Sequence, residues 1–397
     1  MQRKSKSIFN QREKNMKYCA VICELNPFHN GHEYIFRKAR EVSGCDRLIA
    51  IMSGPFVQRG RPAVSSERLR AECAMHYGAD AVIELPVVYA AASGEIFARG
   101  AVNILNTMPD IVCLVMGTES DDPELLRRIA EIRAENGEKF NDALAARLGE
   151  GLPYARALTR ALCDVMPDVP PEKTEEALTC PNNILAIAYA AALIASGSCV
   201  AFMPVKRAND PDRFASATSL RGYVSDRDAE KYMPPLAREI LHNGSAADEK
   251  AFDLLVMHAL RSASLADIAS TPDCAEGFEH KLKDLARVCG SFSELMSAVP
   301  TSRFTRSRIM RICLQTLLGI TRDMQHSGYV CARLIGVRED TKDLLSVLPE
   351  NIIICKRGEA AIPREHLRCF AAERRASDIY SLICGTPCDF YSRLLTV

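Results

Sequence analysis

The stretch CELNPFHNGHEYIFRKAR, residues 23–40, joins an apolar run to a helical pattern and carries two histidines three residues apart. The run KYCAVICEL (17–25) is typical of a buried strand, and GHEYIFRKAREV (31–42) has the apolar spacing of a helix. The chain is therefore predicted to turn directly from a strand into a helix at the HNGH motif.

The HNGH motif (29–32) lies where an anion would be held. A helix N-terminus has free N–H groups and a partial positive charge, and Gly31 would let a phosphate approach the backbone. His29 and His32 could then donate to phosphate oxygens whose charge grows during attack at phosphorus. The alternative is that one histidine caps the helix and the other is an ordinary surface residue; the motif alone does not decide between them.

Strand and helix patterns alternate through the first half of the chain. The further strand runs are RLIAIM (47–52), AVIEL (81–85), DIVCLVMG (110–117) and CVAFMPV (199–205), and SSERLRAECAMHYG (65–78) and EIFARGAVNILNTM (95–108) are helical. This alternation with short connections predicts an α/β fold with a parallel sheet. Ligands bind beyond the carboxyl ends of the strands in such a sheet, and the HNGH motif follows the first strand.

The sequence changes in character near residue 234. Residues 1–15 are expected to be a disordered leader or an upstream start, because Met16 directly precedes the first strand. Residues 16–233 are predicted to form the parallel-sheet domain. Residues 234–397 are predicted to form a separate, mostly helical module with a strong helix at 306–320 and short β runs at 329–337 and 351–356.

Composition excludes several classes of protein. Lys plus Arg equals Asp plus Glu at 50 each, so any binding to nucleic acid must use a local patch. No apolar run reaches the length of a membrane span and no secretory signal begins the chain, so we expect a cytosolic protein without membrane contact. The 16 cysteines are scattered and contain no Cys-x-x-Cys pair; we expect buried thiols and no structural metal site.

A second motif supports the catalytic interpretation of the histidines. SATSLR (216–221) would place hydroxyl groups and an arginine at the beginning of a later helix, facing the same phosphates. With both motifs the chain resembles the HxGH nucleotidyltransferase superfamily, whose members attack the α-phosphate of ATP and release pyrophosphate. The resemblance implies a Rossmann-like nucleotidyltransferase domain followed by the helical module.

Within that superfamily the chain is most similar to the bacterial tRNA(Met) cytidine acetate ligases. The similarity is carried by CELNPFHNGH (23–32), MSGPFVQRGRPAV (52–64), ADAVIELP (79–86), EIFARGAVNIL (95–105), MGTES (116–120), PNNIL (181–185) and ASATSLR (215–221), and more weakly by FTRSRIMRICL (304–314) and RASDIYSL (375–382). Membership would imply that acetate is joined to AMP from ATP, with Mg²⁺, and that the acetyl group then passes to the wobble cytidine of elongator tRNA(Met).

The resemblance also implies a set of site residues. His29 and His32 would be catalytic, and the ATP site would consist of Ile22, Cys23, Glu24, Leu25, Asn26, Pro27, Phe28, His29, Asn30, Gly31, His32, Glu33, Tyr34, Ile35, Gly117, Asn182, Arg207 and Ser219. Three of these have simpler interpretations: Asn182 as a helix cap, Gly117 as a loop glycine and Arg207 as a solvated surface residue. QRGRP (58–62) follows the second strand, so Gln58 and Arg59 could reach substrate.

The chain departs from the family pattern at four positions. Pro55 stands where the family usually has a polar residue, Glu67 and Arg68 replace a Lys-Trp pair, and Cys180 replaces a lysine before the PNN motif. If the lysine of the Lys-Trp pair contacts tRNA or phosphate, this chain has lost that contact.

A basic helix is the predicted RNA surface. Arg303, Arg306, Arg308 and Arg311 cluster at the beginning of the strong C-terminal helix and could track RNA phosphates. An ordinary solvated helix face is the alternative.

Three functions from different classes remain. The first is an ATP-dependent acetate–tRNA ligase that needs no protein nucleophile. The second is an adenylyltransferase for a small phosphorylated metabolite, which would leave the C-terminal arginines unexplained. The third is an RNA-binding protein with a vestigial nucleotide fold, against which the intact HNGH and SATSLR motifs argue. The sequence does not decide the acyl group, the tRNA or whether the chain forms a homo-oligomer.

Overall fold

The computed structural model describes residues 16–208, 214, 220, 231–275, 277–299, 304–354 and 356–397. The predicted leader (1–15), Ser219 with the rest of the SATSLR motif apart from Leu220, and Arg303 lie outside the described residues.

A central sheet organises the described chain. Its strand order is β10-β8-β5-β2-β1-β6-β7, with β9 paired to β8. The strands are β1 (Tyr18–Cys23), β2 (Arg47–Ser53), β5 (Ala81–Leu85), β6 (Ile111–Thr118), β7 (Ala201–Lys206), β8 (Ala332–Val337), β9 (Ile352–Ile353) and β10 (Leu395–Thr396). Strands β5, β2, β1, β6 and β7 are parallel, and β8 is antiparallel to β5. The predicted α/β fold with a parallel sheet is confirmed.

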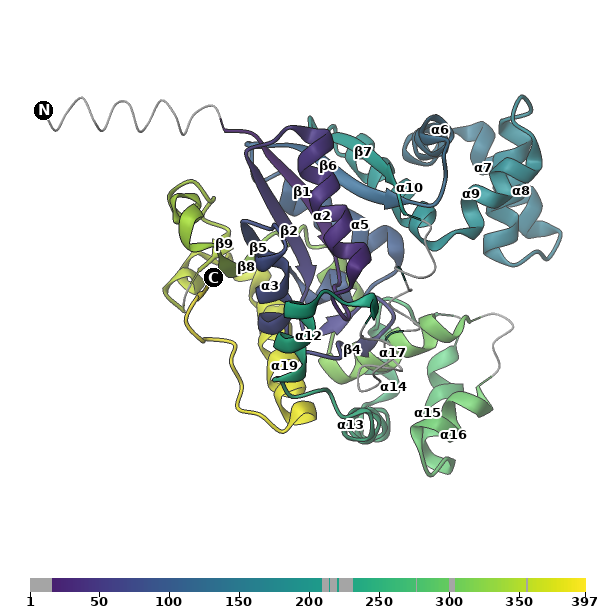
Figure 1. Ribbon diagram of the computed structural model, residues 1–397. Coiled ribbons are helices and arrows are strands. Elements are labelled where there is room, and N and C mark those ends of the chain that lie inside the picture. Colours follow the sequence, from purple (N-terminus) through teal and green to yellow (C-terminus); the bar gives the residue numbers. More distant parts are fainter. Residues whose placement is uncertain are drawn as a thin grey trace, which may run out of the picture.

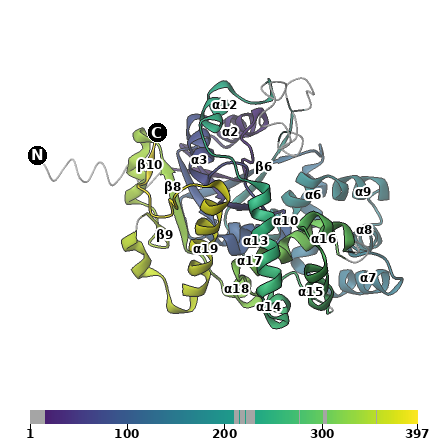
Figure 2. The same ribbon diagram turned by 90° about the horizontal axis from the view of Figure 1, so that it is seen from below.

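Helices cover both faces of the sheet (Figures 1 and 2). One face packs against α2 (Asn30–Ser43), α3 (Glu67–His76) and α12 (Pro235–His242). The other face packs against α4 (Val87–Ala90), α5 (Gly94–Leu105), α10 (Pro181–Ala195), α13 (Glu249–Ser262), α17 (Arg306–Leu318) and α19 (Leu367–Cys384). Because both faces are covered, the inner strands are continuous apolar runs, which is why their positions could be predicted.

A lateral group of helices follows β6. It contains α6 (Pro123–Glu135), α7 (Glu138–Gly149), α8 (Tyr154–Val165) and α9 (Pro171–Thr179), which share a small core with α10. Within the described ranges no single helix is long and apolar enough to span a membrane; α9 and α10 pass that test only as a pair bent by 94°.

The segment after residue 234 completes the sheet as well as adding helices. Its remaining elements are α14 (Leu265–Ser270), α15 (Phe278–Val288), α16 (Phe292–Ala298), α18 (Arg322–His326), and the 3₁₀ helices η2 (Glu339–Ser346), η3 (Lys356–Ala361) and η4 (Arg364–His366). Strand β8 pairs with β5, and one continuous core joins residues before and after 234. The boundary predicted at 234 therefore does not separate two cores, because β5 would otherwise present an unpaired strand edge.

A buried arginine holds together the carboxyl end of the sheet. The Arg70 side chain is fully buried on α3. Its guanidinium donates to the carbonyls of Glu24 at 2.6 Å, Ser53 at 2.9 Å, Gly54 at 2.5 Å and Ser65 at 2.9 Å. Three of those carbonyls belong to the ends of β1 and β2, so Arg70 fixes the edge from which the HNGH turn departs.

We expect Arg70→Met to lower the free energy of unfolding by about 3 kcal/mol or more, because it leaves buried carbonyls without donors. Arg127→Met is the matched control, since the Arg127 side chain on α6 is 58% exposed and its ion pairs with Glu124 and Glu131 are screened by solvent. Urea unfolding of both variants measures the difference; equal stabilities would remove Arg70 from this role.

Candidate active site

Backbone geometry and buried side chains define the turn between β1 and α2. Leu25 lies in the left-handed region at φ +50°, and the Asn26–Pro27 peptide is cis. Leu25 and Phe28 are completely buried beneath the turn. His29 then occupies the N-cap of α2, where its Nδ1 accepts the Gly31 N–H at 3.0 Å. The sequence correctly predicted the strand-to-helix turn, and the structure shows that His29 is the capping histidine.

His32 completes the cap from the first turn of the helix. Its Nδ1 accepts the His29 backbone N–H at 3.2 Å, and the two rings stack with centroids 3.8 Å apart. Since each Nδ1 accepts a hydrogen bond, a neutral ring must carry its proton on Nε2. Capping and anion binding are thus compatible, because each histidine uses one nitrogen for the helix and keeps the other as a donor.

Burial and charge keep both rings neutral. Burial, and then the nearby Arg207 cation, lower the pKa of His29 to about 3. Burial, then His29 and Arg207, hold the pKa of His32 well below its ordinary value. At neutral pH the pair therefore offers two N–H donors without adding charge to the site.

The Arg207 side chain approaches the two histidines from the end of β7 (Ala201–Lys206). Its backbone N–H donates to the Thr118 carbonyl at 2.9 Å, just beyond β7 and β6. A Cβ added to Gly31 would lie 3.7 Å from Arg207 Nη2, and one added to Gly117 would lie 3.2 Å from Arg207 Cγ. The arginine side chain therefore passes across Gly117 toward the first turn of α2. No carboxylate in the described chain forms an ion pair with it.

Close packing requires glycine at positions 31 and 117. A Cβ on Gly31 would meet the His29 ring at 2.9 Å, and one on Gly117 would meet Ile35 at 2.9 Å. The structure thus brings together HNGH, Gly117 and Arg207, which are far apart in the sequence, at one edge of the sheet.

Asn182 joins the same edge through the loop after β6. Its Nδ2 donates to the Glu119 carboxylate, whose other oxygen accepts the Asn183 backbone N–H at 3.2 Å. The buried Asn183 side chain accepts the backbone N–H groups of Glu119 at 2.9 Å and Ser120 at 3.1 Å. The N-cap of α10 is Cys180, so Asn182 is not the capping residue. Glu119 and Asn183 were not predicted, although both lie inside the MGTES and PNNIL motifs.

The remaining residues of the predicted ATP stretch either form hydrogen bonds to neighbouring loops or lie within β1, the turn and α2. Glu24 Oε1 accepts the Gln58 backbone N–H at 2.8 Å, the Asn26 side chain accepts the Val64 N–H at 2.8 Å, and the Asn30 side chain donates to the Lys231 carbonyl at 3.0 Å. Tyr34 donates to the Lys206 carbonyl at 3.3 Å. Ile22 and Cys23 end β1, Pro27 is buried, and Glu33 and Ile35 lie on α2. Burial raises the pKa of Cys23 to about 12, so it remains a thiol.

The QRGRP segment is an ordered hairpin of β3 (Phe56–Val57) and β4 (Arg61–Pro62). Gln58 Nε2 donates to the Ala92 carbonyl at 3.0 Å. A Cβ on Gly60 would lie 2.7 Å from the Arg311 backbone N, so the hairpin packs against α17. In Figure 1 the helices around α17 accordingly lie at the end of the sheet where α2 begins.

The arginines of α17 divide into two kinds. Arg311 is buried and pairs with Asp273 through Nε at 2.9 Å and Nη2 at 3.0 Å. Arg308 donates to the Asp273 carbonyl at 2.8 Å, and its guanidinium lies 4.4 Å from the Phe304 ring centroid. Arg306 is exposed. This ion pair argues against the phosphate contact predicted for Arg311, because the buried guanidinium is already paired with a carboxylate. The order of charges along the helix could not reveal a partner 38 residues away.

Comparison with known proteins identifies the family. The profile of the family described as HIGH nucleotidyl transferase matches residues 16–391. The tRNA(Met) cytidine acetate ligase of Caldanaerobacter subterraneus subsp. tengcongensis is 33% identical over 387 residues, which cover 92% of this chain and 95% of that protein. The chain belongs to the tRNA(Met) cytidine acetate ligase family.

Further relatives agree with this family. The tRNA(Met) cytidine acetate ligase of Clostridium perfringens strain ATCC 13124 is 30% identical over 355 residues, covering 85% of this chain and 88% of that protein. The crystal structure of Thermotoga maritima TmcAL bound with alpha-thio ATP has a TM-score of 0.88 and 27% identity, covering 96% of this chain and 100% of that one. A family of named ligases supports the first of the three functions over the metabolite adenylyltransferase and the vestigial fold.

The neutral histidines make stability depend on pH. Their pKa values lie below those of the unfolded chain, near 6.5, so unfolding takes up protons below that pH. Stability should be complete above pH 6.5 and fall as the pH drops, by up to about 1.4 kcal/mol per pH unit for each histidine. The double variant H29Q/H32Q should show a flatter loss between pH 6.5 and 5 in urea unfolding. An unchanged slope would contradict neutral histidines.

Arg311→Gln should lower the free energy of unfolding by about 3 kcal/mol, because it leaves the Asp273 carboxylate, only 11% exposed, without its cation. Arg306→Gln, at an exposed position on the same helix, is the control and should leave stability nearly unchanged. If Arg306 meets an RNA phosphate, the same variant should reduce the salt dependence of tRNA affinity by roughly one unit of slope. Urea unfolding and filter binding at several salt concentrations test both variants.

Proposed function

We propose that this chain uses ATP to activate acetate as acetyl-adenylate and transfers the acetyl group to the wobble cytidine of elongator tRNA(Met). The carrying observation is the donor arrangement at the beginning of α2. Two neutral histidines that use Nδ1 for the helix, together with Arg207, converge on a helix N-terminus where two glycines permit close packing. The names of the ligase relatives support the acetyl group and the tRNA.

In the first step a carboxylate oxygen of acetate attacks the α-phosphorus of ATP, and the bond to pyrophosphate breaks. Negative charge on the phosphoryl oxygens grows as the transition state forms. The Nε2–H groups of His29 and His32 and the Arg207 guanidinium would donate to that charge from fixed positions, so little reorganisation is needed at the moment of reaction.

Magnesium would accompany ATP as part of the substrate. Among the residues that the structure describes there is no group of three or more histidine, cysteine, aspartate or glutamate side chains that could hold a metal ion. Mg²⁺ commonly binds through substrate phosphates and keeps several waters. The histidines and Arg207 would contact the phosphate oxygens that the ion leaves free.

In the second step the exocyclic amine of the cytidine attacks the acetyl carbonyl. The C–N bond forms, the mixed anhydride breaks, AMP leaves and the amine proton is released. No protein nucleophile is needed, which agrees with the high pKa of Cys23 near the site. The exposed Arg306 on α17 lies on the helix against which the hairpin after β2 packs, so RNA bound there would approach the same edge of the sheet.

We expect His29→Ala and His32→Ala to retain the fold and to slow acetyl-adenylate formation by about 100-fold or more, because each removes a donor to developing charge.

Arg207→Ala should weaken ATP binding with little change in melting temperature. Acetate-dependent pyrophosphate release, ATP affinity and thermal unfolding measure these effects.

The matched control is His32→Gln, whose side-chain amide can both accept from the His29 N–H and donate to phosphate. It should restore part of the activity lost in His32→Ala. Near-normal acetyl-adenylate formation by both alanine variants would refute the catalytic role of the histidines. A panel of small carboxylates, with and without tRNA, tests whether acetate is the acyl substrate; equal pyrophosphate release with every acid would argue against it.

A further inference from the structure

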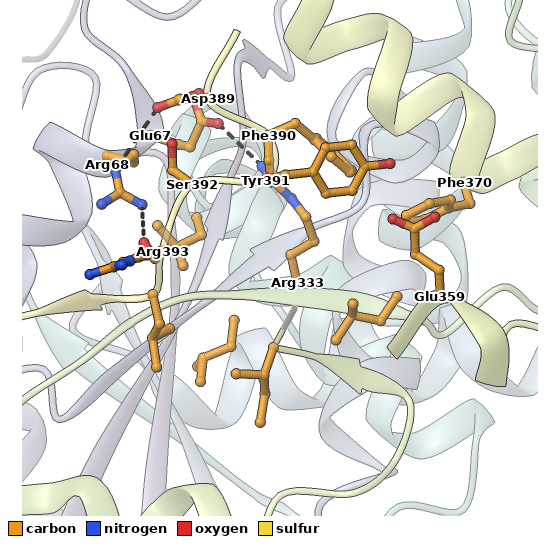
Figure 3. Close-up of a pocket in the computed structure, with 15 residues that line it drawn as sticks. Glu67, Arg68, Arg333, Glu359, Phe370, Asp389, Phe390, Tyr391, Ser392 and Arg393 are labelled. Carbon is orange, nitrogen blue, oxygen red and sulfur yellow. Dashed lines mark hydrogen bonds and ion pairs between the residues drawn. The ribbon is translucent and has the colours of Figure 1, made fainter. Parts of the chain in front are cut away.

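A cavity opens beside β8, at the edge of the sheet from which the HNGH turn departs. Its volume is about 290 Å³, and it lies between α3, β8, β9 and the segment 389–394 that leads into β10. A second hollow of about 400 Å³ adjoins it and shares Glu67, Arg68 and Asp389. Figure 3 shows Glu67, Arg68 and Asp389 close together on one side of the first cavity, with the Tyr391 ring between them and Phe370.

The inner wall of the cavity is charged and fixed. Arg333 pairs with Glu84 at 2.5 Å and with Glu67 at 3.2 Å, and it donates to the Phe390 carbonyl at 2.8 Å. Its guanidinium also lies 4.0 Å from the centroid of the Phe390 ring. Glu67 and Glu84 are both buried, so they hold Arg333 in a fixed position. The lining of the cavity carries equal numbers of carboxylates and cations, which are Glu67, Glu359, Asp389, Arg68, Arg333 and Arg393.

The mouth of the cavity offers both acceptors and donors. Asp389, whose side chain is 39% exposed, faces Arg68 across 3.9 Å, and Arg68 donates to the Arg393 carbonyl at 2.8 Å. The Arg393 side chain is exposed beside them. Burial, then Glu67, raise the pKa of Asp389, so a hydrogen-bond donor placed in the cavity would stabilise its ionised form.

An exposed aromatic ring lies over this mouth. Tyr391 is 44% exposed, its ring stands edge-to-face against Phe390 at 4.9 Å, and the Arg374 guanidinium lies 5.5 Å from its centroid. A flat ring with cations nearby is the usual platform for an unstacked nucleobase.

The lining excludes several ligands. Buried charge is unsuited to a lipid, and no metal-binding cluster is found among the described side chains. A nucleobase with an amino group fits: its faces stack on Tyr391, its N–H groups donate to a carboxylate, its ring acceptors meet an arginine, and its phosphate lies near Arg393.

We propose that this cavity holds an unpaired, amino-bearing base of the RNA substrate, next to the nucleotide that reacts. The proposal rests on the proposed tRNA ligase function. Strands β1, β2, β5 and β8 are consecutive neighbours in the sheet. Three strand spacings of about 4.8 Å therefore place β8, beside the cavity, roughly 14 Å from β1, which leads into the HNGH turn. A single-stranded loop of a few nucleotides can cover that distance with one base at each position.

Fluorescent RNA hexamers of cytidine and of uridine test the proposal on the full chain, because the two bases differ in the amino group that Asp389 would accept. The cytidine hexamer should bind about 10-fold more tightly than the uridine hexamer. Asp389→Asn should reduce this preference to near one. Tyr391→Ala should weaken both hexamers about 10-fold, since stacking does not depend on the base.

Asp340→Asn is the matched control, because the Asp340 side chain is 63% exposed and pairs with Arg338 outside the cavity; it should leave both affinities unchanged. Equal binding of the two hexamers by the unmutated protein would overturn the proposal, as would a cytidine preference that persists in Asp389→Asn. If the Asp389→Asn variant is unstable, Tyr391→Ala provides a second test, because it alters an exposed ring. Unchanged hexamer affinity of the Tyr391→Ala variant would also overturn the proposal.

Acetate-dependent pyrophosphate release separates this proposal from the proposed function. Asp389→Asn should release pyrophosphate as fast as the unmutated protein, and a parallel loss would overturn a separate base site. Absence of that release from the unmutated protein would refute acetate activation, while the hexamer measurements would still decide whether the cavity binds a base.

Discussion

The buried guanidinium of Arg70 is the interaction on which the functional edge of this protein depends. Parallel strands end with carbonyls that no neighbouring strand satisfies in the turn regions, and at the ends of β1 and β2 these carbonyls are buried. Arg70 donates to three of them, those of Glu24, Ser53 and Gly54, and also to the Ser65 carbonyl. A fixed fork of donors on α3 therefore sets the direction in which the chain leaves β1 toward the HNGH turn, and the direction in which it leaves β2 toward the QRGRP hairpin.

The histidine pair shows how a helix cap and an anion site can be the same structure. A helix N-terminus needs acceptors for its first N–H groups, whereas a phosphate needs donors. Imidazole satisfies both requirements, because Nδ1 can accept from the backbone while Nε2–H remains a donor. Burial and Arg207 keep the rings neutral, which fixes this division of roles at neutral pH.

The C-terminal segment contributes to the same edge in two ways. Helix α17 packs its backbone at Met310 and Arg311 against Gly60 in the hairpin after β2, and β8 brings Arg333 to the end of β5. The antiparallel pairing of β8 with β5 is what makes the latter possible, since it places the beginning of β8 beside the end of β5. Residues from the last third of the chain therefore lie at the edge of the sheet from which the HNGH turn departs.

The sequence by itself determined the parallel-sheet fold, the strand-to-helix turn at HNGH and the family, because continuous apolar runs mark buried strands and the motifs are local. Through resemblance it also predicted that Gly117, Asn182 and Arg207 belong to the ATP site. Only the tertiary structure decided which groups meet: the four carbonyls around Arg70, the Glu119 and Asn183 contacts beside Asn182, the ion pair that buries Arg311, and the joining of β8 to β5. These depend on partners tens to hundreds of residues away, and neither periodicity nor charge along the chain specifies where a side chain finds its partner.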